Sequence, residues 1–175
     1  LLAFGGPGRP VRQLAAEVLT VLDSAQGVPE RAKPLAIAGM AFAIVWGANL
    51  FNFMDGSDGL AALMAICGFG ALGVALTRAG LGADACFALV AATSVFLAVN
   101  LPPARAFIGD GGSIVLGFLA AVFSLAGMCS GIWPAWFPLL VFLPFVADAT
   151  LTVLRRLVRG EHLFEAHRTH YYQRL

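Results

Sequence analysis

Five long apolar stretches place the strongest constraint on what this chain can fold into. They cover residues 34–54, 60–77, 85–101, 113–129 and 136–154, and Asp148 is the one charged residue inside them. A helix needs about 20 apolar residues to cross a bilayer core, and backbone groups in lipid must be bonded within the segment. The pattern predicts an all-α protein, a polytopic bundle of about five transmembrane helices.

The composition excludes several other classes of protein. Hydrophobic residues make up 59% of the chain and charged residues 12%, against roughly 25% charged in soluble domains. The net charge of +1 excludes a nucleic-acid binder of the basic-patch type. Cys67, Cys86 and Cys129 are odd in number, and their spacing suits neither a disulfide framework nor a zinc site.

Three regions follow from this pattern. Residues 1–33 form an N-terminal loop and short helix, residues 34–154 the five-helix transmembrane region, and residues 155–175 a polar tail rich in histidine and arginine. The chain begins with Leu1 and shows no signal peptide. We therefore expect a truncated start, with this chain as the C-terminal part of a longer polypeptide.

Counting helices places the polar loops on the two faces of the membrane. Two helices separate loop 55–59 from loop 102–112, and two more separate that loop from the tail, so all three segments share one face. Most arginines outside the apolar stretches lie there: Arg105, Arg155, Arg156, Arg159, Arg168 and Arg174. The positive-inside rule makes this face cytoplasmic, although the basic residues of segment 1–33 disagree. Trp133 and Trp136 are expected at the outer interface.

The first polar cluster ends the first apolar stretch. Asn49, Asn52 and Asp55 follow one another at intervals of three, so they share one helical stripe, and Asp58 follows among glycines. Carboxylates at a membrane edge usually serve function, and oxygen ligands can hold a hard cation. The alternative is a helix end with ordinary capping and turn residues.

The second cluster precedes the fourth apolar stretch. Asp110 stands among glycines where a helix begins, and a helix N-terminus suits a phosphate with a carboxylate to hold Mg²⁺ beside it. Phe107 lies three residues earlier. The alternatives are Asp110 as a helix cap and Phe107 as a core residue.

The third cluster lies in the tail and contains His162, His167, Arg168 and His170. Such residues favour anion binding or proton transfer. A basic tail that touches anionic lipid is the alternative, and zinc finds no HExxH motif or cysteine partner here.

Together the clusters resemble the polyprenyl-phosphate N-acetylhexosamine-1-phosphate transferase family, glycosyltransferase family 4. Its members include phospho-N-acetylmuramoyl-pentapeptide-transferase and the enzymes that initiate O-antigen synthesis. Residues 49–60 match Asn-x-x-Asn-x-x-Asp-Gly-x-Asp-Gly-Leu, and residues 100–113 match Asn-x-Pro-Pro-Ala-x-x-Phe-x-Gly-Asp-x-Gly-Ser. The tail at 165–175 is similar to the branch that begins O-antigen chains.

The resemblance implies a reaction and its partners. Undecaprenyl phosphate, a membrane lipid, would attack the β-phosphorus of a UDP-N-acetyl sugar and release UMP, on the cytoplasmic face of the bacterial inner membrane. The product would initiate lipid-linked O-antigen or cell-wall synthesis. UDP-GlcNAc is the expected sugar donor, and other UDP-N-acetylhexosamines are alternative donors. A homodimer is one option for the oligomeric state.

The resemblance also implies roles for individual residues. Asp110 would bind Mg²⁺, or Mn²⁺ in its place, with Asn52 as a second ligand. Asp55 and Asp58 would line the catalytic pocket together with Asp110, and Asn49 and Asn52 would contact substrate. Phe107 would stack on uracil. The tail would bind the pyrophosphate through His162, His167, Arg168 and His170.

One departure from the family pattern keeps an alternative open. The family carries an Asp-Asp pair in an earlier cytoplasmic loop, and no Asp-Asp occurs in these 175 residues. The alternative is a truncated or decayed relative that binds prenyl lipid or nucleotide without turnover. A transporter is a third reading, but transporters usually place polar residues near the membrane midplane.

The topology predicts the result of cysteine labelling. Single cysteines at Ser57, Gly111 and Thr169 should all react with an impermeant thiol reagent from the same side of the membrane. Labelling of these positions from opposite sides would contradict the helix count.

Overall fold

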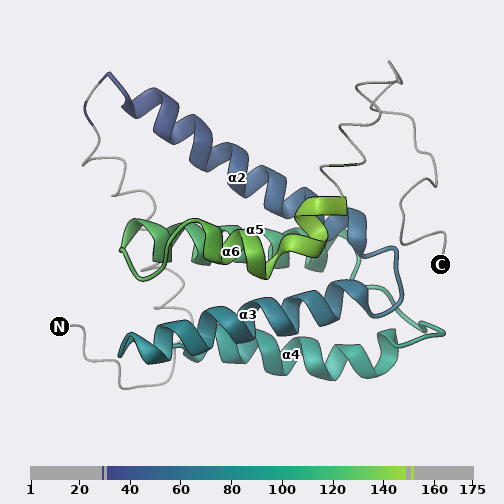
Figure 1. Cartoon of the computed structure of the whole chain (residues 1–175). Helices are drawn as coiled ribbons and strands as arrows, with labels where there is room; N and C mark the ends of the chain where they lie inside the picture. The colour runs from purple at the N-terminus through teal and green to yellow at the C-terminus, as the bar shows by residue number, and fades with distance from the viewer. Residues whose placement is uncertain (1–28, 30, 149–150, 152–175) are drawn as a thin grey trace, which may run out of the picture.

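The regular structure that the computed structural model describes is entirely helical. The structure describes residues 29, 31–148 and 151, and Figure 1 shows the arrangement of its helices. They are α2 (Lys33–Met54), α3 (Leu60–Arg78), α4 (Asp84–Asn100), α5 (Asp110–Cys129) and α6 (Trp136–Val141). The predicted fold class, an all-α helix bundle, is confirmed.

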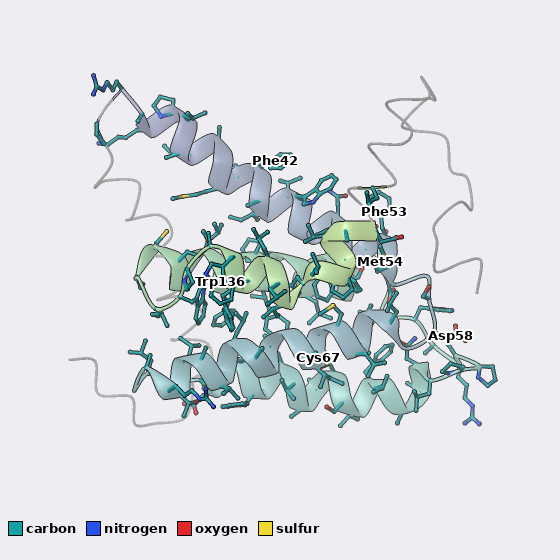
Figure 2. All side chains as sticks on the ribbon, viewed as in Figure 1. Phe42, Phe53, Met54, Asp58, Cys67 and Trp136 are labelled. Carbon is teal, nitrogen blue, oxygen red and sulfur yellow. The ribbon has the colours of Figure 1, made fainter. Side chains whose placement is uncertain are left out.

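Three of these helices are long and apolar enough to cross a membrane. They are α2, α3 and α5, and α4 is an apolar helix of 17 residues, about 25 Å long at 1.5 Å per residue. Large apolar side chains such as Phe42 and Trp136 are exposed along the helices, whereas Asp58 lies in a loop at one end (Figure 2). An apolar outer surface of this kind is expected of a protein whose solvent is lipid.

The fifth apolar stretch departs from the prediction of one continuous helix. α6 ends at Val141, and helical residues resume at 143–148 after Phe142. Pro144 has no backbone N–H to donate to the carbonyl of residue 140, which interrupts an α-helix at this point. The remainder of the predicted stretch lies almost wholly outside the described residues.

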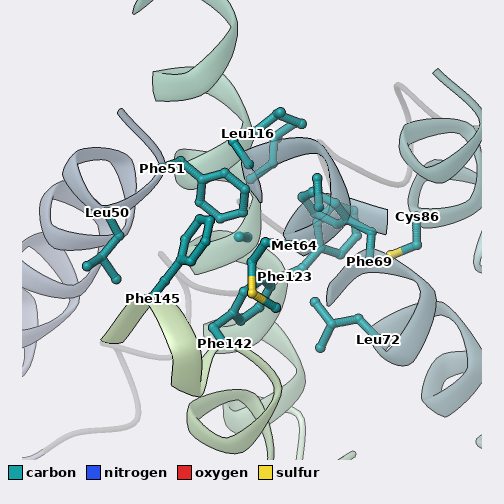
Figure 3. Packing of buried hydrophobic residues seen from close by; sticks show 14 of the residues in the cluster. Leu50, Phe51, Met64, Phe69, Leu72, Cys86, Leu116, Phe123, Phe142 and Phe145 are labelled. Carbon is teal, nitrogen blue, oxygen red and sulfur yellow. The ribbon is translucent and has the colours of Figure 1, made fainter. Parts of the chain in front are cut away.

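The helices pack chiefly in two pairs, α2 with α5 and α3 with α4, and α3 also contacts α5 and α6. α2 and α5 approach so closely that a Cβ atom at Gly117 would collide with the backbone of Gly47. Small residues permit such approaches between membrane helices, where lipid is as apolar as the side chains. Aromatic rings then fill the centre of the bundle (Figure 3), with Phe51 in edge-on contact with Phe142 and Phe145 at centroid distances of 6.1 and 5.0 Å.

The polar loops divide between the two ends of the bundle as the helix count predicts. The α2–α3 and α4–α5 connections meet at one end in Figure 1, and the α3–α4 and α5–α6 connections lie at the other. The first two motif clusters therefore share one end. The third cluster, in the tail, lies outside the described residues, as does most of segment 1–33.

The burial of Trp133 differs from the prediction that this side chain lies at the lipid interface. Its side chain is 6% exposed, and its Nε1–H donates a hydrogen bond to the carbonyl of Ser124 at 3.1 Å. Gly127 leaves the space that the indole ring fills. Trp136, at 62% exposed, has the exposure expected of an interface residue.

Candidate active site

Two loops distant in the sequence are joined at one end of the bundle by side chains of the first cluster. α2 ends at Met54 and α3 begins at Leu60, so residues 55–59 form a tight connection. The longer loop between α4 and α5 carries the second cluster. The contacts between these two loops define the candidate site.

Asp55 makes the most extensive of these contacts. The residue is 7% exposed, and its carboxylate accepts hydrogen bonds from the backbone N–H groups of Ile108, at 3.1 Å to Oδ1, and Gly109, at 2.7 Å to Oδ2. Gly109 has φ 71°, a conformation that glycine adopts without steric penalty. The carboxylate thus fixes the residue immediately before Asp110.

Asn52 connects the last turn of α2 to the first turn of α5. Its Nδ2–H₂ group donates to Oδ1 of Asp110 at 2.8 Å and to Oγ of Ser113 at 3.2 Å. The Ser113 hydroxyl is fully buried and donates to the carbonyl of Gly109 at 2.9 Å. Asn52 and Asp110, the two expected metal ligands, are thereby brought together.

Asp58 supplies a further contact between the loops. It is exposed, and its Oδ2 accepts a hydrogen bond from the backbone N–H of Ala104 at 3.0 Å. Phe107 stands on the same loop as Ala104 and is 50% exposed, so part of its surface is accessible to a ligand. The loop also carries Arg105, whose side chain is exposed.

Asn49 is separated from this group. It is exposed, and its Nδ2 donates to the carbonyl of Val45, one turn earlier in the same helix, at 2.9 Å. The structure therefore brings together Asn52, Asp55, Asp58 and Asp110, places Phe107 beside them in the chain, and does not bond Asn49 to them. The four tail residues fall outside the described residues: His162, His167, Arg168 and His170.

Asn100 belongs to the site, although the sequence did not single it out as a site residue. Its side chain is fully buried at the end of α4. Oδ1 accepts a hydrogen bond from the N–H of Gly59 at 3.1 Å, and Nδ2 donates to the carbonyl of Ala106 at 2.8 Å. The signal that could have identified it is an amide at the end of an apolar stretch, directly before Leu101 and two prolines.

The donor set fits a magnesium ion better than zinc. Within the described residues no three His, Cys, Asp or Glu side chains gather as a metal site would require. Mg²⁺ is usually held by one or two carboxylates together with water and substrate phosphates. Asp110 presents an exposed carboxylate next to the amide of Asn52, and it opens a helix whose first-turn N–H groups favour anions. The carboxylate of Asp110 therefore has the oxygen chemistry that a Mg²⁺ site requires.

The fold and the site together describe a helical membrane protein with a polar site at one end of the bundle. The family model of glycosyl transferase family 4 matches residues 11–128, more than half of the chain. The chain belongs to this family.

Curated bacterial relatives agree with this assignment. The chain is similar to a probable undecaprenyl-phosphate N-acetylglucosaminyl 1-phosphate transferase of Bacillus subtilis (strain 168), with 29% identity over 75% of this chain and 38% of that protein. An undecaprenyl-phosphate alpha-N-acetylglucosaminyl 1-phosphate transferase of Yersinia pestis is 33% identical over 72% and 37% of the two chains. A phospho-N-acetylmuramoyl-pentapeptide-transferase of Thermotoga neapolitana is 35% identical over 66% and 36%.

The aligned part of the chain thus spans less than two fifths of the length of these relatives. With its apolar helices and bacterial relatives, the chain is a bacterial membrane protein.

The contacts of Asp55 predict the effect of an isosteric substitution. Asp55→Asn should lower the free energy of unfolding by about 1–3 kcal/mol, because one of the two buried N–H groups would then face an NH₂ donor. Denaturant unfolding in detergent, followed by circular dichroism, measures this change. Asp58→Asn is the matched control, with a loss below about 1 kcal/mol because its contact is exposed. An Asp55→Asn protein as stable as the wild type would contradict the anchoring role.

Proposed function

We propose that the protein transfers a sugar 1-phosphate from a UDP-N-acetylhexosamine to undecaprenyl phosphate and releases UMP. The observation that carries the proposal is the contact of Asn52 with Asp110, which joins the two motif clusters in a chain of this family. Relatives named for transfer of N-acetylglucosaminyl 1-phosphate to undecaprenyl phosphate support the substrate class.

The proposed reaction exchanges one phosphorus–oxygen bond for another. A terminal phosphate oxygen of the lipid attacks the β-phosphorus of the nucleotide sugar and forms a pyrophosphate. The bond from that phosphorus to the bridging oxygen breaks, and UMP leaves with this oxygen and its electron pair. A phosphate monoester is already largely ionised near neutral pH, so the attacking oxygen does not depend on a strong base. The main requirements are positioning and relief of repulsion between two anions.

The carboxylate of Asp110 and the amide Oδ1 of Asn52 are the groups proposed to hold Mg²⁺, or Mn²⁺ in its place. The ion would supply positive charge between the two phosphate groups. Asp110 contributes an exposed carboxylate, and Asn52 keeps that carboxylate at the start of α5 through its 2.8 Å hydrogen bond. The dipole of α5 adds partial positive charge at the same point.

The loop between α4 and α5 is proposed to bind the nucleotide. Phe107, with half of its surface exposed, would stack on uracil, as aromatic rings do on bases. Asp55 and Asp58 would line this pocket, and their hydrogen bonds to backbone N–H groups keep the loop in shape. Asn49 would contact substrate one helical turn before Asn52.

The tail is proposed to bind the pyrophosphate. His162, His167, Arg168 and His170 provide imidazole and guanidinium groups, which pair with phosphate oxygens. The helix count and the positive-inside rule support a site on the cytoplasmic face of the bacterial inner membrane. A homodimer stays a prediction.

An apolar cavity is proposed to receive the start of the prenyl chain. It has a volume of about 390 Å³ and lies between α2, α5 and the region of α6. Leu50 and Phe51, which precede Asn52, are among its lining residues, with Phe142 and Phe145 opposite. Only the end of the cavity lined by Leu50 and Phe51 approaches Asn52 along α2, and through this end a lipid phosphate would reach the site while its chain stays in an apolar environment. The product would initiate lipid-linked O-antigen or cell-wall synthesis.

The proposal predicts the effect of removing the Asp110 carboxylate. In the full-length protein, Asp110→Ala should lower Mg²⁺-dependent UMP release by about 100-fold or more. Loss of one preorganised electrostatic contact commonly lowers a rate by that much. Its helical circular dichroism should stay unchanged. UMP release from UDP-GlcNAc and undecaprenyl phosphate in detergent micelles measures the activity.

Asp84→Ala is the matched control, because Asp84 is an exposed carboxylate at the start of α4, at the opposite end of the bundle. It should keep wild-type activity. Unchanged UMP release in Asp110→Ala would remove Asp110 from the mechanism. Nucleotide binding by the wild type with no UMP release would favour the non-catalytic relative.

A further inference from the structure

We propose that Asn100 is a positioning residue that holds the α2–α3 connection and the α4–α5 loop in one fixed arrangement. The proposal rests on the proposed function for its effect on turnover. Its structural part stands on contacts of Asn100 alone.

The burial of Asn100 is the first observation. Its side chain has no exposed surface, and most of α4 is apolar. A buried amide is costly unless its polar atoms are bonded. Both ends of this amide are bonded to backbone groups, at 3.1 Å to the N–H of Gly59 and at 2.8 Å to the carbonyl of Ala106.

The identity of these two partners is the second observation. Gly59 follows Asp58 and precedes the first residue of α3, with φ 72°. Ala106 precedes Phe107, the residue proposed to stack on uracil. One side chain thus connects the residues adjacent to two members of the candidate site, 41 and 6 positions away from it in the chain.

The chemistry of the amide explains why asparagine serves here. Its planar group offers an acceptor and a donor at the same time, so it can meet an N–H group and a carbonyl in opposite directions. An aspartate could accept from Gly59, but its second oxygen would face the carbonyl oxygen of Ala106. An alanine would leave the buried N–H of Gly59 unpaired and would remove the side-chain donor to the carbonyl of Ala106.

The position of Asn100 also separates a positioning role from direct substrate contact. Because its amide is buried and bonded to backbone, it would act on the reaction through Phe107 and Asp110. If Asn100 positions the α4–α5 loop, its substitution should increase the mobility of that loop in the protein without ligand. If Asn100 only contacted substrate, its substitution would leave the ligand-free loop unchanged.

The test compares three variants in the protein as its gene encodes it: Asn100→Ala, Asn100→Asp and Thr93→Val. Thr93 is the matched control, a buried residue of the same helix whose hydroxyl bonds to Leu89 within α4. Hydrogen exchange of backbone amides 104–109 is measured without ligand, together with kcat and KM for Mg²⁺-dependent UMP release. Circular dichroism sets a temperature at which each variant is folded.

We expect both Asn100 variants to exchange amides 104–109 at least tenfold faster than the wild type. Their kcat/KM should fall at least tenfold, and Thr93→Val should change neither value more than twofold. Unchanged exchange with lost activity would overturn the proposal, because Asn100 would then contact substrate directly. Changed exchange with unchanged kcat/KM would also overturn it.

Two further outcomes keep the structural and functional parts distinct. If neither Asn100 variant folds, the wild-type protein tests the proposal. Its Gly59 amide should exchange at least tenfold more slowly than in an unstructured peptide. A Gly59 amide without this protection would overturn the proposal. If the wild type releases no UMP, the proposed function fails, and faster exchange in the Asn100 variants would still support the coupling of the two loops.

Discussion

The buried carboxylate of Asp55 is the interaction on which the candidate site depends. It accepts the backbone N–H groups of Ile108 and Gly109, which lie more than fifty residues away in the chain. A charged acceptor bonded to two N–H groups is among the stronger polar contacts in proteins. It determines where Asp110 stands relative to α2, and hence whether Asn52 reaches it. The sequence predicts that Asp55 is a catalytic residue. In the structure Asp55 also holds the α4–α5 loop, which carries Phe107 and leads to Asp110.

The apolar helices explain why such polar anchors are needed. Lipid gives no hydrophobic drive for helices to associate, so α2 and α5 pack through the close approach of Gly47 and Gly117 and through aromatic rings at the centre. These contacts align the helices but do not shape the loops at their ends. The loops are held by hydrogen bonds in which Asn52 donates, Asp55 and Asp58 accept, and Asn100 does both, each with a segment brought near by the helix packing.

The sequence predicted the parts of this arrangement that depend on local pattern. Uncharged runs identified α2, α3, α4 and α5, and the helix count placed the first two clusters at one end. The break at Phe142 was signalled by Pro144, but a hydropathy pattern does not weigh a missing N–H donor. α5 begins at Asp110, where the glycines of the second cluster predicted the start of a helix. The buried partners of Asp55 and Asn100 were beyond sequence reasoning, since they depend on which backbone groups the packing brings within reach.

Mn²⁺ binding followed by electron paramagnetic resonance tests the central claim most directly, because the signal of free Mn²⁺ diminishes when the ion is bound. The account predicts one Mn²⁺ per chain in the presence of a UDP-sugar, displaced by Mg²⁺ and lost in Asp110→Asn. Mn²⁺ bound equally well by the wild type and by Asp110→Asn would contradict a cation site at the junction of the two loops.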